Sequence, residues 1–267
     1  MSRNATKDLT TGSPMKLILS FGIPLLFGML FQQFYNMMDT IIVGKFLGVS
    51  ALASVGATGS INFMIIGFCM GVCNGFAIPV AQRFGARDEH SMRKFVANSV
   101  WLSIIFAVVM AVLVCVFCRQ ILELMNTPED IIDGSYSYIF VIFLGIPATY
   151  MYNLLSGIMR SLGDSKTPLY LLIFSSILNI ILDLLSIIVL KMGVAGAAWA
   201  TVIAQAISGF CCLGVIWKKF PILHVQREEW QPDKLCILNL CNMGIPMGLQ
   251  YSITAIGSVI IQAAVNS

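Results

Sequence analysis

Two aspartates, Asp39 and Asp183, are the only acidic residues inside the long apolar segments of this 267-residue chain. A charged carboxylate in the middle of a bilayer costs about 3 kcal/mol, so an acid there indicates a functional site. Two carboxylates in one poorly solvated pocket cannot both stay charged cheaply, because burial and mutual repulsion each favour protonation. If the two meet, one of them is expected to hold a proton or a cation near neutral pH.

Neutral polar residues accompany each aspartate at helical spacing. Gln32, Asn36 and Asp39 stand at positions i, i+4 and i+7, which places them on one face of a helix, and Tyr35 lies four residues before Asp39. Such a polar face is expected to point at another helix or at water, because lipid offers it no partner.

A second polar face on a later segment contains Asn179 and Asp183, and Thr201 follows on the segment after that. At 1.5 Å per residue, these three and Asp39 reach similar depths in the outer half of a bilayer. We therefore predict that Asp39, Asn179, Asp183 and Thr201 converge in one pocket. Their oxygens suit either H⁺ or Na⁺, a hard cation, and the set alone does not choose between the two ions.

The composition excludes a water-soluble fold. Hydrophobic residues make up 58% of the chain and charged residues 11%, and the mean hydropathy is +0.86. Six nearly uncharged stretches can each cross ~30 Å of hydrocarbon as a helix: Leu17 to Gly44, Phe46 to Gln82, Phe95 to Cys118, Gly134 to Met159, Thr167 to Leu190 and Met192 to Trp217. A seventh begins at Leu235. The sequence thus predicts an all-α membrane protein, a six-helix transmembrane bundle plus a partial seventh helix.

Basic residues set the orientation, because they concentrate on the cytoplasmic side of membranes. Most fall at one end of the predicted bundle: Arg3, Lys7, Lys16, Arg83, Arg87, Arg93, Lys94, Arg160, Lys166, Lys218, Lys219, Arg227 and Lys234. Only Lys45, Arg119 and Lys191 fall at the other. We predict a multi-pass protein of a bacterial inner membrane with a cytoplasmic amino terminus. The net charge of +3 then reflects topology and not affinity for nucleic acid.

The charged segment 218–234 divides the chain into a lobe at 1–217, a cytoplasmic linker, and the first helix of a second, truncated lobe at 235–267. Gly22-Ile23-Pro24 recurs as Gly244-Ile245-Pro246, as expected of two repeated lobes. A third copy at Gly145-Ile146-Pro147 keeps coincidence open as an alternative. The eight cysteines are interpreted as small apolar filler, and with only two histidines present no cofactor and no zinc-type cluster are expected.

Several motifs resemble one transporter family. Asn36-x-x-Asp39 followed by Ile41-Ile42-Val43-Gly44, the segment 178–183, and the loops 82–88 and 160–164 are similar to the amino-terminal lobe of multidrug and toxic compound extrusion (MATE) transporters. The paired acids resemble the DinF-type branch.

The resemblance implies that Asp39, Asn179, Asp183 and Thr201 form a site for a coupling H⁺ or Na⁺. It implies that Gln32 and Asn153, together with Tyr35 and Asn36, lie near the drug-binding cavity. The family has twelve spans in two lobes, so the carboxy-terminal lobe is expected to be missing from this chain.

The expected function is cation-coupled antiport, with export of organic, often cationic, drugs by alternating access. The partners are then a small organic molecule and the lipid bilayer, and the protein is not an enzyme. One alternative is a lipid-linked oligosaccharide flippase of the same superfamily, which the lack of Lys or Arg within the spans disfavours. Another is a non-functional fragment. An intramembrane aspartyl protease is disfavoured because Asp183 lacks a Gly-x-Gly-Asp context.

Overall fold

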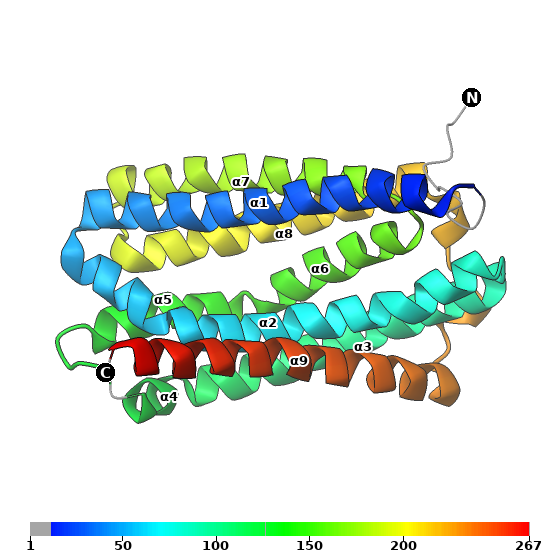
Figure 1. The fold of residues 1–267 in the computed structure, drawn as a ribbon. Coiled ribbons are helices and arrows are strands. Elements are labelled where there is room, and N and C mark those ends of the chain that lie inside the picture. The colour runs from blue at the N-terminus through cyan, green and yellow to red at the C-terminus, as the bar shows by residue number, and fades with distance from the viewer. Residues whose placement is uncertain (1–11, 126, 267) are drawn as a thin grey trace.

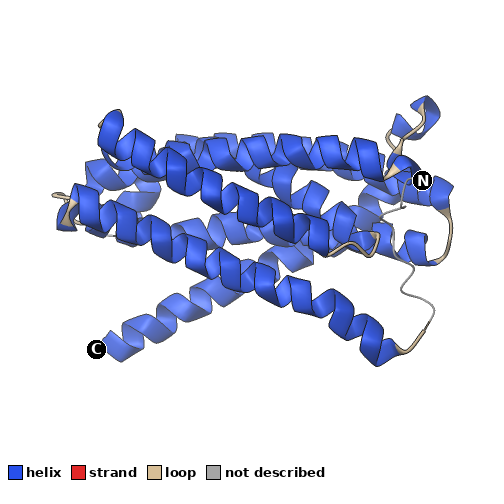
Figure 2. Cartoon of the chain, turned by 90° about the horizontal axis from the view of Figure 1, so that it is seen from above, coloured by secondary structure: helices blue, strands red, loops and turns tan. Residues whose placement is uncertain are grey.

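The computed structural model describes residues 12–125 and 127–266, and all its regular elements are helices (Figure 2). The apolar runs form helices because lipid leaves backbone groups no other partner. The elements are α1 (Pro14–Leu47), α2 (Val49–Gly85), α3 (Glu89–Val116), α4 (Cys118–Leu124), α5 (Ile132–Leu144), α6 (Ile146–Ser161), α7 (Lys166–Leu184), η1 (Leu185–Val189), α8 (Gly193–Lys219), η2 (Pro221–Leu223), η3 (Arg227–Trp230) and α9 (Lys234–Asn266).

The predicted fourth span is broken. Helices α5 and α6 meet at Gly145 with a bend of 46°, and together they pass as one crossing. Pro147 lies in the first turn of α6, where its missing N–H costs no helical hydrogen bond. Within the described residues, five further helices are long and apolar enough to cross a membrane, which gives up to six crossings. The predicted all-α transmembrane fold is confirmed.

The helices form two groups that α5 and α6 join (Figure 1). Helix α7 packs against α1 and α8 on one side, and α2 packs against α3 and α9 on the other. Helix α6 contacts both α2 and α8, and α5 does the same. Phe143 on α5 and Tyr150 on α6 are among the largest fully buried side chains. The bent fourth span is therefore the centre of the lobe.

Successive connections alternate between the two ends of the bundle. The amino end of α1 lies at the same end as the connections after α2, α6 and α8 (Figure 1). Lys16, Arg83, Arg93, Lys166 and Lys234 belong to this end. Arg3 and Lys7, which the sequence analysis places there as well, lie outside the described residues.

The segment expected to be a linker is packed against α3. Helix α8 continues to Lys219, and η2 and η3 follow it before α9 begins. The indole N–H of Trp101 donates to the Trp230 carbonyl over 3.1 Å, and the Asp233 backbone N–H donates to Asn98 Oδ1 over 2.9 Å. These contacts attach the connection to the first lobe.

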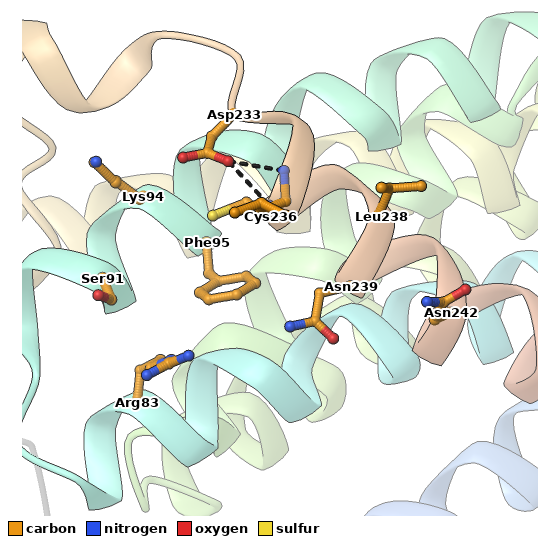
Figure 3. A pocket seen from close by; sticks show the side chains of 10 residues that line it. Arg83, Ser91, Lys94, Phe95, Asp233, Cys236, Leu238, Asn239 and Asn242 are labelled. Carbon is orange, nitrogen blue, oxygen red and sulfur yellow. Dashed lines mark hydrogen bonds between the residues drawn. The ribbon is translucent and has the colours of Figure 1, made fainter.

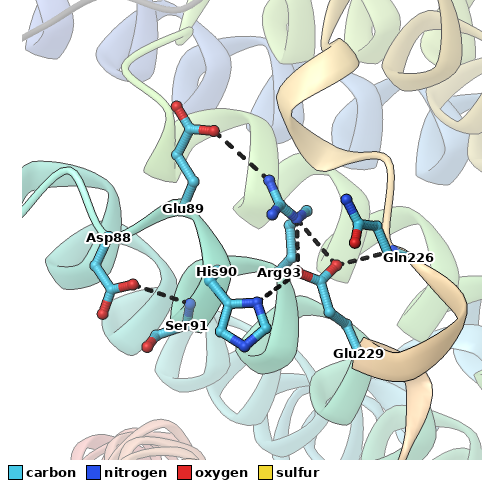
Figure 4. Close-up of polar contacts among 7 residues, drawn as sticks. All are labelled: Asp88, Glu89, His90, Ser91, Arg93, Gln226 and Glu229. Carbon is cyan, nitrogen blue, oxygen red and sulfur yellow. Dashed lines mark hydrogen bonds and ion pairs between the residues drawn. The ribbon is translucent and has the colours of Figure 1, made fainter.

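Glu229 anchors this connection (Figure 4). Its side chain is 1% exposed, and Arg93 Nε donates to both of its oxygens over 2.9 Å. His90 Nδ1 lies 3.0 Å from Oε1, and the Gln226 backbone N–H donates to Oε2 over 2.8 Å. Burial alone would raise the pKa of Glu229, but these donors outweigh it and hold the pKa below its usual range.

We predict that Glu229→Gln destabilises the chain by about 2 kcal/mol at neutral pH, because it weakens charge-assisted hydrogen bonds to Arg93. A carboxyl whose folded-state pKa is depressed stabilises above its unfolded pKa, and this stabilisation is lost as the pH falls through the folded value. The difference between wild type and variant in detergent melting temperature should therefore shrink on acidification. Glu228→Gln, at an exposed neighbour, is the matched control and should change the melting temperature little. An equal loss in both variants would contradict the prediction.

Candidate functional site

The two intramembrane aspartates meet between α1 and α7. Asp39 is 9% exposed and Asp183 is fully buried. Their carboxyl groups lie within hydrogen-bonding range of each other, and α1 packs against α7 along this face. Two carboxylates accept hydrogen bonds but cannot donate them, so a proton or a small cation between the two would stabilise this contact.

Asn179 connects this pair to α8. With its amide nitrogen facing Asp183, Asn179 donates to Asp183 Oδ2 over 2.9 Å, and its oxygen accepts from the Thr201 hydroxyl over 3.3 Å. The opposite orientation would set the amide oxygen against acceptors only. The Tyr35 hydroxyl donates to Thr201 Oγ1 over 3.3 Å. The structure thus brings Asp39, Asn179, Asp183 and Thr201 together, and Tyr35 joins them.

Two buried oxygens in this cluster have no hydrogen-bond partner within the described chain: Asp39 Oδ1 and Asp183 Oδ1. Leaving buried acceptors unsatisfied costs about 1–3 kcal/mol each, and more when they are charged. A small cation or a proton placed between the carboxylates would satisfy them. The oxygen atoms of the cluster are therefore of the kind that could ligate a monovalent hard cation or share a proton.

The backbone changes directly after Asp183. Helix α7 ends at Leu184 and continues as a π-helix, η1, in which the Leu190 N–H donates to the Leu185 carbonyl over 3.0 Å. Such π-turns interrupt α-helices mainly at functional sites. The interruption gives the segment beside the buried acid a helical geometry that differs from the rest of α7. No pattern in the sequence indicates it.

Sequence reasoning missed Tyr138 on α5. This tyrosine is 6% exposed and lies within electrostatic range of Asp39, Asp183 and Tyr35. Ser135 precedes it by three residues, but this spacing does not show which helix Tyr138 faces, so only the packing of α5 could reveal it.

The residues assigned to a substrate cavity lie on α1 and α6. Asn36 is exposed, and its amide lies 3.5 Å from Gln33 Oε1 on the same helix. Asn153 is half-buried in α6 and donates to the Thr149 carbonyl over 2.8 Å. Gln32 is half-buried on α1. Tyr35 instead contacts Thr201 in the carboxylate cluster.

Arg160, which the sequence analysis places in the loop after the fourth span, lies in the last turn of α6. Helix α6 extends through this residue to Ser161, and Arg160 is half-buried with Nη2 donating to Asn74 Oδ1 over 3.3 Å. Asn74 Nδ2 lies 3.5 Å from the Tyr251 hydroxyl. Because α6 is still helical at Arg160, its side chain turns toward α2 instead of leaving through the loop. A chain of polar contacts therefore links α6, α2 and α9.

Comparison with known proteins identifies the class to which this fold and site belong. The model of the MatE family matches residues 24–185, so the chain belongs to the MatE family, a family of membrane transporters and not of enzymes. The matched region begins at Pro24 and includes the aspartate pair and Asn179.

Individual relatives share the fold and about a quarter to a third of the residues. The chain is 31% identical to the probable multidrug resistance protein YoeA of Bacillus subtilis, covering 92% of this chain and 55% of YoeA. It is 30% identical to the probable multidrug resistance protein YpnP of the same organism, covering 97% of this chain and 58% of YpnP. The chain spans about half the length of these curated relatives.

A solved structure of a MOP superfamily transporter from Pyrococcus furiosus Vc1, described as having a binding pocket of reverse polarity, superposes with a TM-score of 0.89 at 26% identity. The match covers 98% of this chain and 58% of that one. The six-helix bundle and α9 thus correspond to somewhat more than half of a solved transporter.

Proposed function

We propose that this chain is the amino-terminal lobe, with the first helix of the second lobe, of a DinF-type MATE antiporter that exchanges H⁺ or Na⁺ for organic, often cationic, drugs. The observation that carries the proposal is the pair of buried carboxylates, whose orphaned oxygens call for a cation. Membership of a transporter family and relatives named for multidrug resistance support it.

The coupling follows from differential binding. An ion shifts a conformational equilibrium only by its different affinity for the two states. The cluster takes ligands from three helices, α1, α7 and α8, so binding an ion there draws these helices together and releasing it frees them. The carboxylate pair would open toward the outside when empty and close around the ion. This direction assumes the orientation that the basic residues predict, with a cytoplasmic amino terminus in an inner membrane.

The organic substrate would occupy the space between the lobes, with Gln32, Asn36 and Asn153 as candidate lining residues. The second lobe that completes this space is not part of the sequence.

The test of this function is transport by a two-lobe form, obtained by reading the gene beyond the Ser267 codon. Proteoliposomes are loaded with a cationic dye, and an inward gradient of H⁺ or Na⁺ is imposed. The dye should leave the liposomes, and collapsing the gradient of the coupling ion should stop this export. The ion whose gradient drives export is the coupling ion. Export that continues at the same rate with neither gradient would contradict antiport.

Arg160 favours a second candidate, a transporter of anionic lipid-linked substrates. Its guanidinium forms no ion pair within the described residues, and it faces Asn74 inside the bundle. A half-buried cation of this kind attracts phosphate or carboxylate groups, and the Pyrococcus relative is described as having a pocket of reverse polarity. Competition of the dye efflux by an anionic lipid-linked sugar, lost in Arg160→Gln, would favour this candidate over drug export.

A further inference from the structure

A pocket of about 520 Å³ lies where the cytoplasmic ends of α2 and α3 meet the start of α9 (Figure 3). It is separate from the carboxylate cluster and contains none of its residues. Two basic residues, Arg83 and Lys94, line it together with the polar side chains of Ser91, Asn239 and Asn242. A volume of this size accommodates a small-molecule group.

The positive charge of the pocket is available to a ligand. Lys94 forms no ion pair among the described residues, and Arg83 has only Asp88 at 3.7 Å, where both side chains are more than a third exposed. Exposed pairs of this kind contribute little. The guanidinium of Arg83 lies 5.7 Å from the centre of the Phe95 ring, and this buried ring holds it at the pocket wall.

Asp233, the one acid in the lining, is engaged elsewhere. Its Oδ1 accepts the backbone N–H groups of Leu235 and Cys236 over 2.8 and 3.2 Å, as Figure 3 shows. It therefore serves the first turn of α9, whose unpaired N–H groups need an acceptor. The amides of Asn239 and Asn242 make no hydrogen bond within the described chain and remain free donors.

Apolar surface continues from the charged end of the pocket along α9. Leu235 is 78% exposed and Leu238 50% exposed, although both line the pocket. Positive charge and amide donors beside exposed leucines match an amphiphile with an anionic head and a hydrocarbon chain. Basic pockets between transmembrane helices on the cytoplasmic side bind such head groups.

We propose that this pocket binds the phosphodiester head group of an anionic phospholipid of the inner leaflet, with Arg83 and Lys94 on the phosphate and the acyl chain along Leu235 and Leu238. Assignment to the inner leaflet rests on the orientation in the proposed function, whereas lipid binding itself does not depend on which ion or drug is transported. A bound lipid would join α2 and α3 of the first lobe to α9.

The test is native mass spectrometry of the purified chain titrated with phosphatidylglycerol or phosphatidylcholine. One phosphatidylglycerol should bind in preference to phosphatidylcholine. A cation that lies against the bound head group contributes about fivefold to such binding, and this attraction falls off within a Debye length, so Arg83→Gln with Lys94→Gln should weaken it roughly 25-fold. The control Lys218→Gln with Lys219→Gln removes the same charge from the same end of the bundle, outside the pocket, and should leave affinity within about twofold.

Charge-retaining Arg83→Lys with Lys94→Arg should keep most of the affinity, which separates loss of charge from loss of folding. Equal binding of both lipids, or an equal loss in the control pair, would overturn the proposal. Displacement of the lipid by free glycerol 3-phosphate at the same concentration would identify a soluble phosphate site instead and also overturn it. Loss of the bound lipid in the two-lobe form would show that the second lobe fills the pocket. This result would also overturn the proposal.

Discussion

Asp183→Asn is expected to reduce ion-driven efflux by the two-lobe form to background. Asp183 is fully buried, lies in direct contact with the Asp39 carboxyl, and accepts from Asn179 over 2.9 Å. An amide at this position cannot bind a proton and supplies no charge to a cation. Losing one charge-assisted ligand weakens cation binding roughly 10- to 100-fold, and without ion binding the gradient cannot bias the two conformations.

The measurement is dye efflux from inverted vesicles under an imposed gradient, with membrane insertion checked by fluorescence size-exclusion chromatography. Asp39→Asn should give the same loss because the two carboxyls act as one site. Ser176→Ala is the matched control on α7, since Ser176 is also buried but donates only to the Leu172 carbonyl of its own helix over 2.9 Å. Undiminished efflux in the correctly inserted Asp183 variant would exclude the carboxylate pair as the coupling site.

Convergence of the four cluster residues could be predicted because each is a polar residue in an apolar run. Counting 1.5 Å per residue from the nearest charge places Asp39 and Asp183 at similar depth, and lipid leaves polar faces no partner but one another. The structure brings these residues together. Their role in ion binding stays a prediction.

Residues whose importance depends on a neighbouring helix could not be predicted. Periodicity shows which side chains share one face of a helix, but it does not show which helix covers that face. The sequence therefore makes no prediction for Tyr138, and it places Arg160 in a loop because helix ends are uncertain by one or two residues. The buried Glu229 falls within the charged segment assigned to a linker, since its partner Arg93 is far away in sequence.

The same limit applies to the long contact between α2 and α9. The sequence shows Gly71-x-x-x-Gly75 and Gly244-x-x-x-Gly248, but only the structure shows that the two motifs face each other. A Cβ added at Gly75 would lie 2.5 Å from the Gly244 Cα, and one at Gly71 would lie 2.6 Å from the Met247 carbonyl oxygen. Small residues at such crossings let the two backbones touch, and van der Waals packing then holds the helices together.

Replacing both Gly71 and Gly75 by alanine is expected to separate α9 from α2 and lower the stability of the chain by several kcal/mol. Each added methyl group meets backbone atoms that cannot rotate away, and overpacking of this kind costs about 1–3 kcal/mol per site. The measurement is the melting temperature of the purified protein in detergent.

Gly59→Ala is the matched control on α2, because a Cβ there would have no atom within 4 Å. It should leave the melting temperature unchanged or raise it, since alanine favours a helix over glycine by about 1 kcal/mol. If the double variant has the same melting temperature as the control, backbone contact between α2 and α9 does not hold the two helices together. A lowered melting temperature in the double variant alone would mean that α2 of the first lobe holds α9 by packing at these glycines. Any movement of a second lobe must then rotate about this contact or break it.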